Sequence, residues 1–212
     1  MYEAKVSGRQ QYRYFDSALK KEYEESIQLE NDLENAIKNQ AIFPYFQPQY
    51  CLKTQKIIGL EALARWQHPE KGFVAPSRFI PLAQRLSLIT LLTESIMKQA
   101  GTNLLSFIKV VPDLKLAINI SGSECSNPHI LHLTQQLLTE NHLEAKQVEL
   151  EVTESILIEH AESSIEILTA LHDLGVSIAI DNFGAGYSSL GYLTALPIDI
   201  LKIDMSFVQG IG

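Results

Sequence analysis

The sequence is poor in the residues that mark several large classes of protein. It has two cysteines among 212 residues, Cys51 and Cys125, and neither belongs to a CxxC pair, so we expect reduced thiols without a disulfide framework. No stretch reaches the roughly 18 uncharged apolar residues that a membrane-spanning helix requires, and the first residues lack an apolar signal core. These shortages predict a cytoplasmic segment without membrane contact of its own, whether or not the parent protein is membrane-tethered upstream.

Positive charge is also scarce. Lys and Arg number 17 against 25 Asp and Glu, which gives a net charge of −8 at pH 7. Non-specific binding of nucleic acid polymers needs clustered basic residues, so we expect no such partner. The six histidines are scattered, which disfavours zinc and predicts solvent-facing or helix-facing roles for most of them. A small anionic ligand still fits this composition if a metal or a local site supplies positive charge.

The chain does contain a regular alternation of apolar runs and helical segments. Residues 16–41 are rich in charged and amide residues, with apolar residues near helical spacing, and we expect an acidic connecting helix there. Beyond it, six runs have the texture of strands: 43–49, 57–66, 114–121, 148–154, 176–183 and 198–204. Apolar strands that alternate with helices predict a parallel sheet, and the pattern alone fits both a β/α barrel and a doubly wound sheet. No GxGxxG or GxxxxGK[ST] follows any strand.

Polar residues gather where these predicted strands end. A single acidic residue at such a position is ordinarily a helix cap or a turn residue. Five successive strands that each end in a carboxylate, an amide or a lysine are harder to explain by capping, because the carboxyl ends of parallel strands converge on one face. The residues are Glu61 and Arg65, Asn119 and Ser121, Glu151 and Glu154, Asp181 and Asn182, and Lys202 and Asp204.

Hard oxygen donors predominate among them, namely Glu61, Asn119, Glu151 and Asp181. Such donors suit Mg²⁺ or Mn²⁺, and an ion held there would polarise a phosphoryl oxygen and lower the pKa of a bound water. Lys202 is expected to orient that water or to neutralise charge in the transition state. The alternative for Lys202 is a structural role, as an interior lysine paired with Asp204 or Asp181.

Seven motifs, taken in order, resemble the EAL family of bacterial cyclic di-GMP phosphodiesterases. They are YFQPQY, EALARW at 61–66, PSRFIPLAQ at 76–84, INIS at 118–121, ELEVTE at 149–154, IDNFGAGYSSLGYL at 180–193 and LPIDILKID at 196–204. The resemblance covers roughly residues 31–212. It implies a TIM-like (β/α) barrel whose first strand is antiparallel to the others, and hydrolysis of cyclic di-GMP to linear pGpG with two Mg²⁺ or Mn²⁺ ions.

The resemblance also implies a role for each matching residue. The metal ligands would be Glu61, Asn119, Glu151 and Asp181, with Asn182 at a position that serves the second ion; these carboxylates and Lys202, which orients the water, would form the catalytic set. Gln47, Arg65 and Asp204 fall on positions that line the ligand site. Glu154 matches a glutamate that steadies the loop DNFGAGYSS.

The first fifteen residues, MYEAKVSGRQQYRYF, resemble the end of a GGDEF domain. The expected organisation is therefore a remnant of that domain at 1–15, an acidic connecting helix at 16–41 that overlaps the start of the next domain, and an EAL domain at 31–212. This order is typical of bacterial GGDEF–EAL signalling proteins.

Two departures from the family pattern bear on activity. Active members usually have a second aspartate where this chain has Asn182, which lacks the negative charge. The sequence also stops at Gly212, so we expect about six of the eight barrel strands, and an exposed edge that pairs with another chain, for instance in a homodimer. Two hypotheses follow: a cyclic di-GMP phosphodiesterase, or a degenerate EAL domain that binds cyclic di-GMP as a receptor without turnover.

Overall fold

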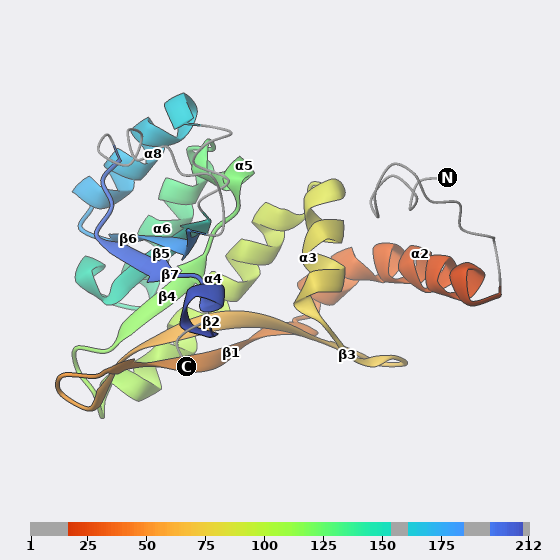
Figure 1. The fold of residues 1–212 in the computed structure, drawn as a ribbon, viewed down its shortest axis with the longest axis horizontal. Coiled ribbons are helices and arrows are strands. Elements are labelled where there is room, and N and C mark those ends of the chain that lie inside the picture. Colours follow the sequence, from red (N-terminus) through yellow and green to blue (C-terminus); the bar gives the residue numbers. More distant parts are fainter. Residues whose placement is uncertain (1–16, 154–160, 185–195, 210–212) are drawn as a thin grey trace.

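A computed structural model describes residues 17–153, 161–184 and 196–209, and it shows an α/β fold built on one sheet (Figure 1). The strands are β1 (Ile42–Cys51), β2 (Lys56–His68), β3 (Gly72–Val74), β4 (Lys115–Asn119), β5 (Val148–Thr153), β6 (Ser177–Phe183) and β7 (Ile200–Ile203). The helices are α2 (Ser17–Lys38), α3 (Pro76–Arg85), α4 (Ile89–Ile108), α5 (Gly122–Cys125), α6 (His129–Glu140), the 3₁₀ helix η1 (Ala145–Gln147), α8 (Ala161–Asp173) and α10 (Met205–Gln209).

The order of the strands distinguishes between the two architectures that the pattern left open. Neighbours in the sheet follow the chain as β1-β2-β4-β5-β6-β7, with β1 antiparallel to β2 and every later pair on this path parallel. A doubly wound sheet reverses direction partway, whereas a barrel sheet does not. The predicted TIM-like sheet with an antiparallel first strand is therefore confirmed. Within the described residues, β1 and β7 end the strand order and do not pair with each other.

One strand and one helix break were not predicted. Strand β3 pairs antiparallel with the end of β2 through a tight turn in which Gly72 has a φ of 68°, a conformation that glycine adopts at little cost. Three residues are too few to produce a periodic signal. The helical segment over 79–108 is divided at Ser87, which has a φ of 59°, and Pro76 opens the first of the two helices.

The apolar core lies between the sheet and its helices. Alternate residues of the parallel strands belong to this core, for example Leu60 and Ala62 in β2 and Leu150 and Val152 in β5. Successive side chains of a strand point to opposite faces of the sheet. The odd-numbered residues of β2 and β5 therefore face the concave side of the sheet, away from the helices. Glu61, Asn119, Glu151 and Asp181 therefore lie on the face that the helices do not cover.

Helix α2 packs onto the barrel as part of its core. Leu29, Leu33, Ala36 and Ile37 are buried, and ion pairs join Glu25 to Arg78 and Glu30 to Arg85 of α3. In Figure 1 the helix lies beside α3, at the end of the β1–β2 ribbon. No helix in the described part of the chain is long and apolar enough to span a membrane.

His68 at the end of β2 is buried, so it is not solvent-facing, and its ring faces helix α2. Its Nδ1 accepts hydrogen bonds from the backbone N–H groups of Glu70 and Lys71, and its Nε2 lies 3.2 Å from Oδ2 of Asp32. An acceptor Nδ1 places the proton of the neutral ring on Nε2, which then donates to Asp32. His68 thus holds the β2–β3 turn and also fixes α2 to the end of β2.

Leu33→Ala tests whether α2 belongs to the same folding unit as the barrel. Leu33 is fully buried, so the substitution should lower the free energy of unfolding by about 2–5 kcal/mol. Urea unfolding followed by circular dichroism measures the change. Ile27→Ala, at an exposed position of the same helix, is the control and should cost much less. An equally small effect of both substitutions would mean that α2 detaches without disturbing the barrel.

Candidate active site

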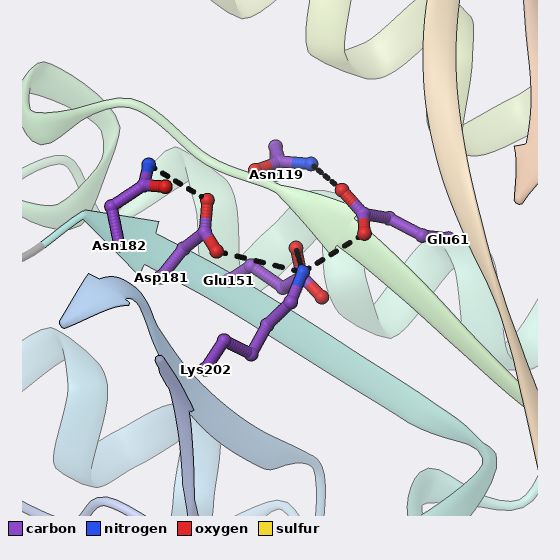
Figure 2. A network of polar contacts seen from close by, with 6 residues as sticks. All are labelled: Glu61, Asn119, Glu151, Asp181, Asn182 and Lys202. Carbon is purple, nitrogen blue, oxygen red and sulfur yellow. Dashed lines mark hydrogen bonds and ion pairs between the residues drawn. The ribbon is translucent and has the colours of Figure 1, made fainter. Parts of the chain in front are cut away.

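Five strands bring six polar side chains together, with Glu61 midway along β2 and the other five near the carboxyl ends of β4, β5, β6 and β7. Pairing places Asn119 of β4 beside Glu151 of β5, and Thr153 of β5 beside Asp181 of β6. Figure 2 shows these side chains pointing toward one another. The members are Glu61, Asn119, Glu151, Asp181, Asn182 and Lys202.

The ammonium group of Lys202 lies at the centre of this cluster. Its Nζ is 2.6 Å from Oε2 of Glu151, 2.9 Å from Oε2 of Glu61 and 3.7 Å from Oδ1 of Asp181. The Glu151 side chain is fully buried and the other three are no more than 25% exposed, so water screens these charges weakly. One positive charge therefore offsets part of the repulsion among three carboxylates.

Two amides complete the hydrogen bonding of two of the carboxylates. Nδ2 of Asn119 donates to Oε1 of Glu61 at 3.0 Å, and Nδ2 of Asn182 donates to Oδ2 of Asp181 at 3.0 Å. Glu151 differs, because its Oε1 is buried and has no hydrogen-bond partner among the residues that the structure describes. A buried carboxylate oxygen without a partner is costly, which makes this atom a candidate ligand for a further cation.

Burial and neighbouring charges shift the pKa values of these groups in different directions. Burial raises the pKa of Glu151 to about 7, although Lys202 acts in the opposite direction. Burial also tends to raise the pKa of Glu61, but hydrogen bonds from Lys202 and Asn119 outweigh it and hold the pKa below its ordinary value. Burial tends to lower the pKa of Lys202, but hydrogen bonds and charge interactions with Glu151 and Glu61 outweigh this effect. The pKa of Lys202 is therefore raised to about 12. Lys202 is therefore a cation at every physiological pH.

The donor set suits a hard divalent cation. Three carboxylates, among them that of Glu151 with its unpartnered Oε1, and two amide side chains offer the oxygen donors that Mg²⁺ and Mn²⁺ prefer, and no thiolate or imidazole lies among the six residues of the cluster. As placed, however, no three Asp, Glu, His or Cys side chains in the described part of the chain have the spacing of a metal site. The carboxylates are spread around the ammonium group, so metal binding requires them to move toward a common point.

The residues expected to line the ligand site lie at different distances from this cluster. Gln47 is exposed and lies directly opposite Glu61 in the β1–β2 pairing. Arg65 follows on the same face of β2, with its guanidinium 5.8 Å from the centre of the Tyr45 ring. Asp204 acts as a cap, because Oδ1 accepts the N–H of Ser206 at the start of α10, and this bond lowers its pKa. Its pairing with Lys202, one of the alternatives considered, is not what the structure shows; the lysine pairs with Asp181 and two glutamates instead.

Glu154 and most of the loop that it was predicted to steady lie outside the described residues. Ser121, another of the polar residues at the predicted strand ends, caps the helix that follows it. Its N–H and its hydroxyl both donate to Oε2 of Glu124, in a capping box at the start of α5. The S-x-x-E spacing of 121–124 is a sequence signal for this motif.

Glu149 is a further acidic residue of the interior face that sequence reasoning left without a role. It precedes Glu151 by two residues, is 3% exposed, and has its pKa raised by burial, against the effect of Lys115. The alternation of side chains along β5 was sufficient to place it beside Glu151.

The sheet and this site define a TIM-type α/β domain with an acidic, lysine-containing centre at the carboxyl ends of its strands, where enzymes of that architecture place their chemistry. The family model of the EAL domain matches residues 30–212, and the chain belongs to that family.

Relatives and solved structures agree with this assignment. The chain is 36% identical over 210 residues to the bifunctional diguanylate cyclase/cyclic di-GMP phosphodiesterase MucR of Pseudomonas aeruginosa, covering 99% of this chain and 31% of that protein. It is 34% identical over 212 residues to the cyclic di-GMP phosphodiesterase NbdA of the same organism, covering 100% of this chain and 27% of NbdA. It thus spans less than a third of the length of each of these relatives. The solved c-di-GMP complex of PaMucR phosphodiesterase superimposes with a TM-score of 0.81 at 36% identity, covering 86% of this chain and 74% of that one.

Glu151→Gln tests the ionisation of the central glutamate in the presence of a chelator. A carboxylate whose pKa rises from 4.5 to about 7 on folding favours the folded state most when protonated. The free energy of unfolding of the wild type, relative to the Gln variant, should therefore fall as the pH rises through this window. Urea unfolding at about pH 5 and about pH 8 gives the two differences, and Glu34→Gln, on the exposed face of α2, is the control. If the difference in unfolding free energy between the wild type and Glu151→Gln were the same at both pH values, the pKa of Glu151 would not be raised on folding.

Proposed function

We propose that this chain carries a cyclic di-GMP phosphodiesterase activity, which opens one phosphodiester bond of the cyclic dinucleotide to give linear pGpG. The observation that carries the proposal is the convergence of Glu61, Glu151 and Asp181 on Lys202 from four strands of the sheet. The names of the relatives MucR and NbdA, and the c-di-GMP bound to PaMucR, support the same substrate.

Each residue of the cluster takes a role in this proposal. Glu61, Asn119, Glu151 and Asp181 hold divalent cations, with Asn182 as a neutral neighbour of the second position. Mg²⁺ or Mn²⁺ bound there supplies Lewis acidity toward a phosphoryl oxygen and lowers the pKa of a water. Since its pKa is about 12, Lys202 acts by donating hydrogen bonds and neutralising charge, and does not abstract a proton.

The reaction exchanges one phosphorus–oxygen bond for another. The oxygen of the attacking water forms a bond to phosphorus while the bond to the ribose 3′ oxygen breaks, and the leaving oxygen is protonated. Gln47 and Arg65 hold the substrate on the β1–β2 side of the cluster, and Asp204 contributes from the β7 side. In this proposal Arg65 supplies the charge that the anionic substrate requires on an otherwise acidic chain.

The organisation of the parent protein is part of the proposal. Residues 1–15 end a GGDEF domain, residues 16–41 form the connecting helix, and residues 31–212 belong to the EAL domain of a bacterial signalling protein that acts in the cytoplasm. The segment contacts neither a membrane nor a nucleic acid polymer. The proposal also includes a second copy of this chain, in a homodimer, as a partner.

Asn182 supports a second candidate, a receptor that binds cyclic di-GMP without turnover. Its φ of 55° lies in the left-handed region, where asparagine is among the favoured residues. The side chain donates to Asp181 and adds no negative charge to the site. A weakly held second ion would permit binding of the dinucleotide but slow its hydrolysis.

The decisive assay is single-turnover hydrolysis of cyclic di-GMP with Mn²⁺, with pGpG measured by chromatography. The wild-type chain should form pGpG, and Glu61→Gln should lower the rate by a factor of about 10²–10⁴, because it removes a charge on which several groups converge. Glu34→Gln removes an exposed carboxylate of α2 and should leave the rate unchanged.

The Asn182→Asp variant separates the enzyme from the receptor. Aspartate also tolerates the left-handed conformation, so the variant should fold normally. A wild type that binds cyclic di-GMP without forming pGpG, together with turnover by Asn182→Asp, would establish the receptor and overturn the enzyme. A chain that neither binds nor hydrolyses the dinucleotide would contradict both.

A further inference from the structure

Three aromatic rings form a row on the outer part of the β1–β2–β3 ribbon. The ring centres of Phe43 and Tyr45 are 5.7 Å apart, and those of Tyr45 and Phe73 are 6.1 Å apart with the planes at 70°. Tyr45 is 48% exposed and Phe73 is 61% exposed, although most aromatic residues of this size lie in cores. We call Phe43, Tyr45 and Phe73 the aromatic row. It does not belong to the apolar core and needs another explanation.

The aromatic row shares a face with the catalytic cluster. In the β1–β2 pairing, Gln47 lies opposite Glu61, Tyr45 opposite Leu63 and Phe43 opposite Arg65. Phe73 of β3 lies opposite Gln67, on the same side of β2. Glu61 and Arg65 are four residues apart in an extended strand, a separation of about 13 Å. The cluster and the rings therefore lie on the same face of these strands, and Figure 1 shows the β1–β2 ribbon extending past the barrel toward β3.

Arg65 connects the two parts of this surface. Its guanidinium lies 5.8 Å from the centre of the Tyr45 ring, within the range of a cation–π contact. Among the described residues it donates one hydrogen bond, from Nη1 to the carbonyl of Ala64. Guanidinium has five N–H donors in a planar fork, so the remaining donors are available for a phosphate. A cation beside exposed aromatic rings provides complementary partners for the phosphate and the base of a nucleotide.

We propose that the aromatic row is a stacking platform for a purine base, so that Tyr45 and Phe73 determine specificity for a nucleotide over other phosphodiesters. The inference rests on the proposed function for its substrate, a guanine of cyclic di-GMP, but the platform itself follows from the geometry. Stacking on aromatic side chains needs an exposed ring and no hydrogen-bond partners, which Tyr45 and Phe73 provide.

Comparison of two monophosphates isolates the contribution of the base. Guanosine 5′-monophosphate and ribose 5-phosphate differ only in the purine, and neither contains the diester bond that the chain would hydrolyse. We expect the wild-type chain to bind the nucleotide about 5- to 100-fold more tightly in calorimetric titrations with Mg²⁺. Tyr45→Ala should bring this ratio close to one, and Phe73→Ala should reduce it. Tyr45→Phe, which keeps the ring, should retain it.

Tyr50→Ala is the matched control, because Tyr50 is an equally exposed aromatic residue of β1 beyond Gln47, at the opposite end of the strand. It should leave the ratio unchanged. In turnover experiments, Tyr45→Ala should raise the KM for cyclic di-GMP by a similar factor and change kcat much less, as removal of uniform binding does.

The outcomes separate this inference from the proposed function. If the wild type binds both monophosphates equally, or Tyr45→Ala keeps the wild-type ratio, the platform is refuted even where cyclic di-GMP is hydrolysed. If Tyr45→Ala dissociates a dimer while the ratio persists, the row is a protein contact and the inference also fails. If the base-dependent ratio is present and lost in Tyr45→Ala, but cyclic di-GMP is not hydrolysed, the platform stands and the proposed enzyme does not.

Discussion

The site depends on one interaction, the contact of the Lys202 ammonium with three carboxylates from three other strands. Acidic side chains that are partly removed from water repel one another and resist ionisation, and the pKa of about 7 for Glu151 records that cost. The ammonium reduces the cost without removing it, because one charge faces three. The cluster therefore retains a capacity for additional positive charge, which is the property that a divalent cation would use.

The apolar core sets the positions of these charged groups. Leu60, Leu150 and Ile178 face the helices, and strand pairing then turns the alternate residues toward the interior. A shift of one residue in any of these strands would move its acidic side chain into the core and an apolar side chain into the site. Burial of the core thus specifies the register, and the register brings together residues such as Glu61 and Lys202 that lie 141 positions apart.

Strand positions and the acidic strand ends were predictable because they depend on local alternation and composition. The antiparallel first strand came from the family resemblance, and its pairing with β2 confirms it. Other features depend on contacts between distant segments and have no local signal. The burial of His68 against α2 and the central position of Lys202 are of this kind, whereas Asp204 caps the N–H of Ser206 only two residues away. The row formed by Tyr45 and Phe73 also appears only when β3 folds back on β2.

The central claim is that Lys202 occupies the charge-binding centre of the carboxylate cluster, and Mn²⁺ titration of Lys202→Met by calorimetry tests it most directly. Lys38→Met, which removes an exposed lysine of α2, is the control and should bind Mn²⁺ as the wild type does. Removal of the competing ammonium should make Lys202→Met bind Mn²⁺ more tightly than the wild type. Equal or weaker binding by this variant would contradict the account, because the carboxylates around Lys202 would then not be the metal-binding groups.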